Sequence, residues 1–94
     1  MAVQVAETLS TKEKKKFPTD FSPSLPTNVT VASAVAVHTP PSGSALIPTV
    51  SVVSPYVYVT LGKVTVLGTH GLSVVATLSD GQEIEVLYSI VVGW

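Results

Sequence analysis

Cysteine is absent from this 94-residue sequence, charged residues are few, and no long apolar run is present. Without cysteine the chain has neither disulfides nor thiolate metal sites. Its net charge of −1 predicts no general affinity for nucleic acid. Polar and turn-forming residues interrupt the apolar positions before they reach the roughly 20 residues that a membrane helix needs, and the N-terminus lacks a secretory signal. We therefore expect neither a membrane nor a nucleic-acid partner.

The residue groupings that carry catalysis are also missing. His38 and His70 lie in different segments with no Asp, Glu or Cys close in sequence, so we interpret them as loop or strand-end residues. Asp80 is explained by a turn, and Glu83 and Glu85 by the outward face of a strand. The six glycines fall near turns, and none belongs to a phosphate-binding loop. The sequence predicts no enzyme, no cofactor and no metal site.

Valine and threonine dominate what is present, with eighteen and eleven copies. Both are β-branched and favour strands over helices, and a chain of this length forms one domain with a modest core. Between Asp20 and Asp80, Lys63 is the only formally charged side chain apart from the two histidines. We expect a weakly charged β surface that contacts other protein, with a monomer solubilised by threonine and serine as the alternative.

The C-terminal segment, residues 71–94, has the pattern of two strands joined by a turn at Asp80-Gly81. Apolar residues alternate with polar ones on both arms, with the period of a half-buried strand. A two-residue loop would place Leu78 opposite Glu83, setting an apolar side chain against a charged one. We therefore predict a register one residue away, with a three-residue loop or a bulge beside the turn. The expected pairs are Leu78 with Ile84, Ala76 with Val86, Val74 with Tyr88, and Leu72 with Ile90.

Upstream of this hairpin, turn signals divide the chain into short segments. Residues 1–16 lack sustained periodicity and are expected to form an extended N-terminal arm, which could add as a strand to another subunit's sheet. Three prolines exclude a helix or a central strand from residues 17–26. Strands are expected at 28–38, at 45–53 with an early part weakened by Pro48, at 56–61 and at 64–67. With the hairpin, these segments predict an all-β, immunoglobulin-like antiparallel β-sandwich of six to seven short strands over residues 17–94.

The strand expected at 28–38 has two unlike faces. The small residues of one face suit close packing against another layer, whereas the other face is made of valines. The first face holds Thr30, Ala32, Ala34 and Ala36, and the second holds Val29, Val31, Val35 and Val37.

Aromatic and arm residues supply the candidate interface. Tyr56, Tyr58 and Trp94 could form an aromatic platform for sugar or protein, although alternating tyrosines also suit ordinary sheet packing and a terminal tryptophan can cap a core. The phenylalanines of residues 17–26 are expected to anchor the start of the fold. The complete set of possible interface residues is Val3, Val5, Phe17, Phe21, Tyr56, Tyr58 and Trp94.

Five features follow one another in a characteristic order along the chain. A charged N-terminal lead is followed by an Asp20-Phe-Ser-Pro-Ser-Leu25 segment, a Val/Thr/Ala strand, a middle strand ending Leu61-Gly62, and a Thr77-Leu-Ser-Asp-Gly-Gln-Glu83 turn before a final strand. Over most of residues 12–92 this order resembles the small immunoglobulin-like phage virion proteins known as fibre–tail adaptor proteins.

The resemblance implies a non-enzymatic structural part of a virion, acting as a neck/tail or fibre-attachment adaptor. Its expected partners are other virion proteins, namely portal or neck, tail, fibre or major capsid proteins, in a multi-copy assembly. A capsid decoration protein is the main alternative. A carbohydrate-binding or adhesin module that uses Tyr56, Tyr58 and Trp94 is a further one, because immunoglobulin-like sandwiches serve many functions.

Overall fold

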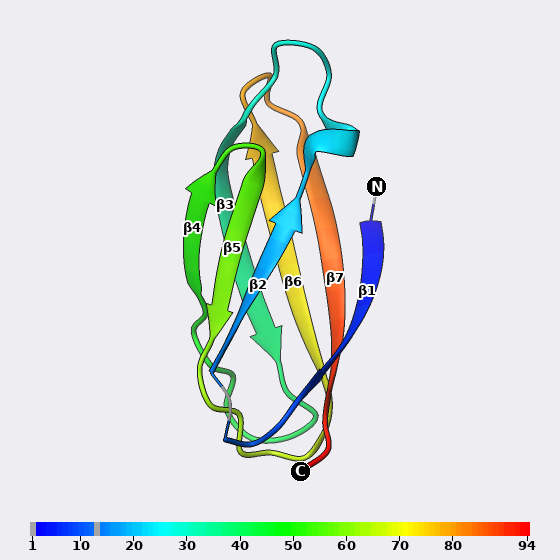
Figure 1. The fold of residues 1–94 in the computed structure, drawn as a ribbon, viewed down its shortest axis with the longest axis vertical. Coiled ribbons are helices and arrows are strands. Elements are labelled where there is room, and N and C mark those ends of the chain that lie inside the picture. The colour runs from blue at the N-terminus through cyan, green and yellow to red at the C-terminus, as the bar shows by residue number, and fades with distance from the viewer. Residues whose placement is uncertain (1, 13) are drawn as a thin grey trace.

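The computed structural model describes residues 2–12 and 14–94 and shows a sandwich of two β-sheets, as expected (Figure 1). The four-stranded sheet has the order β1 (Ala2–Leu9), β7 (Glu83–Val92), β6 (Gly68–Leu78), β3 (Val31–Thr39). The three-stranded sheet has the order β2 (Lys15–Asp20), β5 (Tyr56–Leu61), β4 (Thr49–Val53). Lettered A to G along the chain, these strands make sheets A-G-F-C and B-E-D. This is the immunoglobulin arrangement with its first strand placed on the C-F-G sheet.

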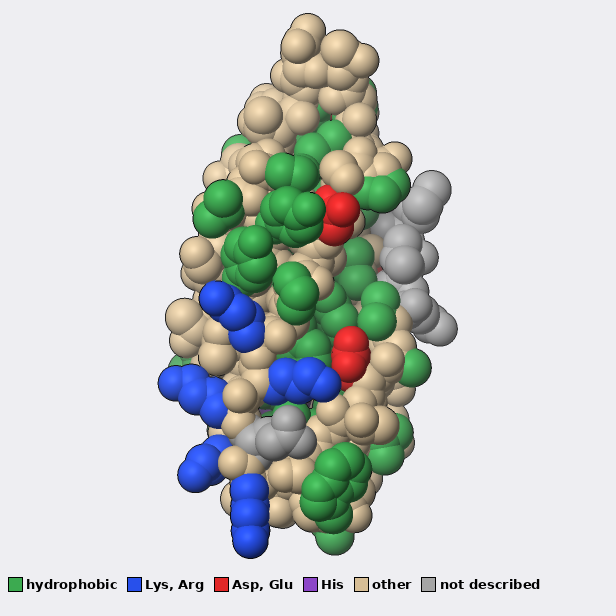
Figure 2. All heavy atoms as spheres, in the orientation of Figure 1, with side chains coloured by type: hydrophobic (Ala, Val, Ile, Leu, Met, Phe, Trp, Pro, Cys, Tyr) green, Lys and Arg blue, Asp and Glu red, His purple; other side chains and the backbone are tan. Residues whose placement is uncertain are grey.

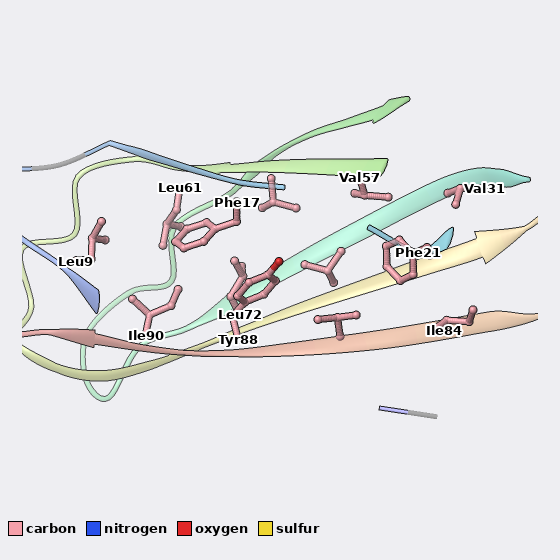
Figure 3. Packing of buried hydrophobic residues seen from close by; sticks show 14 of the residues in the cluster. Leu9, Phe17, Phe21, Val31, Val57, Leu61, Leu72, Ile84, Tyr88 and Ile90 are labelled. Atoms are coloured by element: carbon pink, nitrogen blue, oxygen red, sulfur yellow. The ribbon is translucent and has the colours of Figure 1, made fainter. Parts of the chain in front are cut away.

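The core lies between the two sheets and is built by the alternation of apolar residues along the strands (Figure 3). On β5, Val57, Val59 and Leu61 are fully buried, while the residues between them face outward. Inward positions of β6 and β7 oppose them, and the rings of Phe17 and Tyr88 pack with centroids 5.3 Å apart across the layers. Apolar burial of this kind is the main force that holds two sheets together.

The β6–β7 hairpin has its apolar residues on the expected face but a different register. Ala76 lies opposite Ile84, and Thr77 opposite Glu83 is the last pair before the turn. The observed register thus differs by two residues from the expected one, which was wrong. A shift of two leaves every side chain on the same face, so the hydrophobic pattern does not distinguish the two registers. The turn decides between them, because the Leu78 amide donates to the Gln82 carbonyl at 2.7 Å.

Strand β3 contains a bulge between Val31 and Ser33 that changes which residues face the core. Before the bulge Val31 is buried, and after it Ala34 and Ala36 pack against the core. The expected small face is therefore confirmed for Ala34 and Ala36 and wrong for Thr30 and Ala32, which are exposed. The expectation that Val31 shares a face with Val35 is wrong, because the extra residue turns the strand over.

Residues 1–16 were expected to form an arm outside the sandwich, and this division needs correction. Residues 2–9 form β1, which runs parallel to β7 of the same chain, and Lys15 and Lys16 open β2. The sandwich thus begins before Phe17, and one strand pair is parallel rather than antiparallel. The open hydrogen-bonding edge of β7 and the burial of Leu9 explain why the chain adds this strand to its own sheet.

The remaining elements follow the proline and glycine signals closely. Strand β4 begins directly after Pro48, and β2 is an edge strand followed by the short 3₁₀ turn η1 (Ser22–Ser24). The strand expected at 64–67 is absent from the structure, since β6 begins only at Gly68. Within the described ranges, no helix is long and apolar enough to cross a membrane.

Candidate protein-binding surfaces and a buried histidine pair

The outward side of β3, β6 and β7, here called the outer sheet face, carries exposed valines. Val35 and Val37 are 64% and 55% exposed, and Val91 is exposed at the other end of the face. Rows across the strands join Val35 to Val75 and Val37 to Ser73. Most remaining positions on the face are Thr, Ser or Gly, and Glu85 lies opposite Val75.

The outer sheet face bears few charges. On β3, β6 and β7 its ionisable residues are Glu83 and Glu85, and the Ser73 hydroxyl donates to the Glu85 carboxylate at 2.7 Å. A shallow cavity of about 370 Å³ lies on the face where Gly71 has no side chain, between Thr39 and Ser89. A neutral, partly apolar and hollowed surface suits contact with protein better than contact with polyanions.

The tyrosines lie on the opposite side of the molecule, on the outward side of β5. The rings of Tyr56 and Tyr58 stack with centroids 6.0 Å apart, and Tyr56 is 39% exposed. The Lys16 ammonium lies 5.0 Å from the Tyr58 ring centroid. Figure 2 shows this face, with hydrophobic side chains across its middle and the lysines grouped in its lower half.

Trp94 does not join these tyrosines. It is exposed at the C-terminus, whereas Tyr56 begins β5 at the other end of the sandwich (Figure 1). The backbone around it is tied to the end of β1, since the Gly93 amide donates to the Leu9 carbonyl and the Thr11 amide to the Trp94 carbonyl. The three aromatic residues therefore do not form one platform.

Phe17 and Phe21 belong to the core rather than to an interface. Both are 2% exposed, and the Phe21 amide donates to the Pro55 carbonyl at 3.0 Å. They anchor the start of the fold, as expected, but their assignment to an interface is wrong. Val5 packs partly buried against the core, and the backbone of Val3 lies opposite Val86 in the parallel β1–β7 pair. The backbone at both positions is therefore paired within the chain's own sheet.

The sequence reasoning missed a buried pair formed by His38 and His70. The two rings are 3% and 1% exposed and stack with centroids 5.1 Å apart. Both residues lie near strand ends, as expected, but they also occupy inward positions, His70 in phase with Leu72 and His38 in phase with Ala36. That shared phase is the signal that could have identified them as buried.

Three hydrogen bonds run in line through the histidine pair. The Leu46 amide donates to His38 Nδ1 at 2.9 Å, His38 Nε2 lies 2.9 Å from His70 Nδ1, and His70 Nε2 lies 2.7 Å from the Val66 carbonyl oxygen. An amide only donates and a carbonyl only accepts, so both rings are neutral with their proton on Nε2. Burial, and secondly the neighbouring His70, lower the pKa of His38 below 6.5.

The histidine pair is not arranged as a metal centre. Each of its four ring nitrogens already has a hydrogen-bond partner. Among residues 2–12 and 14–94, no three His, Cys, Asp or Glu side chains are placed to hold a metal ion. The described geometry therefore offers surfaces for protein contact and a structural histidine pair.

Comparison with known proteins assigns no family to the chain. No protein-family model matches it, and neither a curated protein nor a solved structure is detectably similar.

Proposed function

We propose that this chain is a non-enzymatic structural protein of a bacteriophage virion, acting as a neck/tail or fibre-attachment adaptor. The observation that carries the proposal is the outer sheet face, where Val35 and Val37 are largely exposed among neutral residues. Contiguous apolar surface rimmed by polar residues is typical of protein interaction sites. The resemblance of the segments 20–25 and 77–83 to fibre–tail adaptor proteins supports the choice of a virion.

The proposed partners are portal or neck, tail, fibre or major capsid proteins. A small domain with one modest contact face gains strength from repetition, because a symmetric assembly multiplies a weak contact. A capsid decoration protein would use the same face on the capsid surface, and it is the alternative within this class.

Purified particles test this proposal. Virions of the phage that encodes the chain, banded on a density gradient, should contain it in several copies per particle. Antibody labelling under the electron microscope should mark the neck or tail for an adaptor and the capsid surface for a decoration protein. Absence of the chain from banded particles would overturn the proposal.

A pair of matched variants tests the outer sheet face itself. Val37→Lys places a charge on this face, whereas Val53→Lys places one at a similarly exposed valine on β4 of the other sheet. Incorporation into particles should fall strongly for Val37→Lys and change little for Val53→Lys. Equal effects of the two variants would show that the face is not the contact.

A carbohydrate-binding module is the second candidate, favoured by the stacked Tyr56 and Tyr58 rings. Aromatic faces bind sugar rings by stacking and exclusion of water. A glycan array of the purified chain should show a ligand under this candidate, and Tyr56→Ala/Tyr58→Ala should abolish its binding while incorporation into particles stays intact. If no glycan on the array binds, the carbohydrate-binding candidate is excluded and the virion proposal is the one that remains.

A further inference from the structure

The connection between β3 and β4, residues 40–48, presents apolar side chains to solvent at one end of the sandwich. Ile47 is 95% exposed, and Leu46 beside it is also exposed. Within the described chain, the connection is held by the hydrogen bond from the Leu46 amide to His38 Nδ1. The facing connection, residues 62–67, is held by the bond between His70 and the Val66 carbonyl. The histidine pair thus ties two loops to each other through the ends of β3 and β6.

The line of hydrogen bonds accepts no additional proton. Its three donors, which are the Leu46 amide and the two Nε2–H groups, face three acceptors, which are the two Nδ1 atoms and the Val66 carbonyl oxygen. A fourth proton must sit on His38 Nδ1 or on His70 Nδ1. A proton on His38 Nδ1 would place two N–H groups face to face where the Leu46 amide now donates to this atom. A proton on His70 Nδ1 would do the same between the two rings, where His38 Nε2–H now donates. One of these two links must then break.

The hydrogen bond from the Leu46 amide to His38 Nδ1 is the one that breaks. Leu46 lies on an exposed connection and its amide can turn to water, whereas the two rings are confined between paired strands. We propose that His38 and His70 form a pH-sensitive latch, which fastens the 40–48 connection to the sandwich at neutral pH and releases it in acid. The latch is independent of the function proposed above.

The surroundings of the pair favour the neutral state. Residues 40–48 contain no Asp, Glu, Lys, Arg or Tyr, and Ile90 of β7 lies opposite His70. On the facing connection, Lys63 lines a small cavity of about 50 Å³ together with both histidines. Tyr88, the ionisable residue on the inward side of β7, is hydrogen-bonded to Thr19. None of these groups is a carboxylate that would stabilise a charged imidazole.

The lowered pKa of His38 agrees with this geometry. If the opened ring titrates at the ordinary value of 6.5 while the closed ring stays neutral, the population of the opened connection rises roughly thirtyfold from neutral pH to about pH 5. Local opening of this kind is measured by amide exchange.

Hydrogen exchange of the purified chain between about pH 7.5 and 5 tests the latch. After correction for the intrinsic exchange rate, protection of the Leu46 amide should fall by at least about tenfold, and at each pH this amide should be less protected than those of Val57 and Val59, because the latch opens without unfolding of the core. Unchanged protection of Leu46 would overturn the proposal, and so would equal protection of all three amides at about pH 5, because the latter indicates that Leu46 opens only by global unfolding.

A double variant separates the latch from other acid effects. The glutamine side chain offers an NH2 group as donor and a carbonyl oxygen as acceptor but does not titrate, so His38→Gln/His70→Gln can keep the line of bonds without its pH response. Protection of Leu46 in this variant should be independent of pH over the same range. An acid-induced loss as large as in the parent chain would assign the release to other groups.

If the double variant does not fold, the parent chain still decides the question. Nitrogen-15 NMR of the two imidazoles should show neutral rings with the proton on Nε2 at pH 7.5, and loss of the Leu46 bond should coincide with ring protonation. A charged ring at pH 7.5, or protonation without loss of that bond, would overturn the proposal.

Discussion

The hydroxyl oxygens of Thr19 and Tyr88 lie 2.6 Å apart inside the sandwich and join the two sheets by a side-chain hydrogen bond. Thr19 is on β2 and Tyr88 on β7, so the bond links the start of the chain to its end. Both residues are almost completely buried. Inside the core the Thr19 hydroxyl depends on Tyr88, whereas the Tyr88 hydroxyl also donates to the Pro18 carbonyl oxygen at 3.4 Å.

Removal of one partner should therefore cost more than removal of both. We expect Tyr88→Phe to lower the free energy of unfolding by about 1–2 kcal/mol, since the Thr19 hydroxyl loses its main partner. Thr19→Val added to Tyr88→Phe should recover part of that loss. Urea unfolding of the four chains in a double-mutant cycle measures the coupling. Strictly additive effects would show that the hydrogen bond does not stabilise the fold.

Acid should weaken the fold through the histidine pair. The pKa of His38 is lowered by burial and then by His70, so below 6.5 the unfolded chain binds a proton that the native chain does not. The stability contributed by the neutral ring is complete above the unfolded value of 6.5 and declines as the pH falls below it. Urea midpoints at pH 8, 7, 6 and 5 check this expectation. The decline should be shallower in His38→Gln/His70→Gln, whereas parallel curves would exclude the histidines as its source.

The turn after β6 depends on a glycine with a left-handed backbone. Gly81 has φ of +91°, and an added Cβ there would meet open space, so backbone conformation alone sets the cost. We expect Gly81→Ala to destabilise the chain by about 1 kcal/mol. Gly62→Ala is the matched control, because Gly62 also faces open space without a positive φ. Thermal unfolding should separate the two variants, and equal midpoints would contradict the conformational argument.

Deletion of residues 1–9 should expose the edge of β7. Leu9, which is fully buried, and the whole parallel β1–β7 pairing are lost, so we expect lower stability and association that increases with concentration. Sedimentation of the full chain and of the truncated chain at several concentrations measures their association. A truncated chain that stays monomeric with an unchanged unfolding midpoint would show that β1 is dispensable.

The strands with the clearest alternation were predicted best. The inward sets of β5, β6 and β7 follow directly from apolar residues at every second position, and Pro48 marked where β4 could begin. The histidine pair escaped prediction because its two members are 32 residues apart in the sequence and lie on β3 and β6, which become neighbours only when the sheet forms. The bulge in β3 escaped because a single inserted residue leaves no mark in a run of Val, Ala and Ser.

The sequence alone therefore determined the all-β class, the inward side of the central strands and the nearly uncharged span that contributes β3 and β6 to the outer sheet face. These properties are local, since the period of two and the turn residues act within a few positions of the chain. Tertiary structure decided what pairs with what: β1 with β7, Ala76 with Ile84, and His38 with His70. The physical reason is that alternation specifies the side a residue faces but not its partner. Partners are chosen when the sheets close and every buried donor and acceptor must be satisfied together.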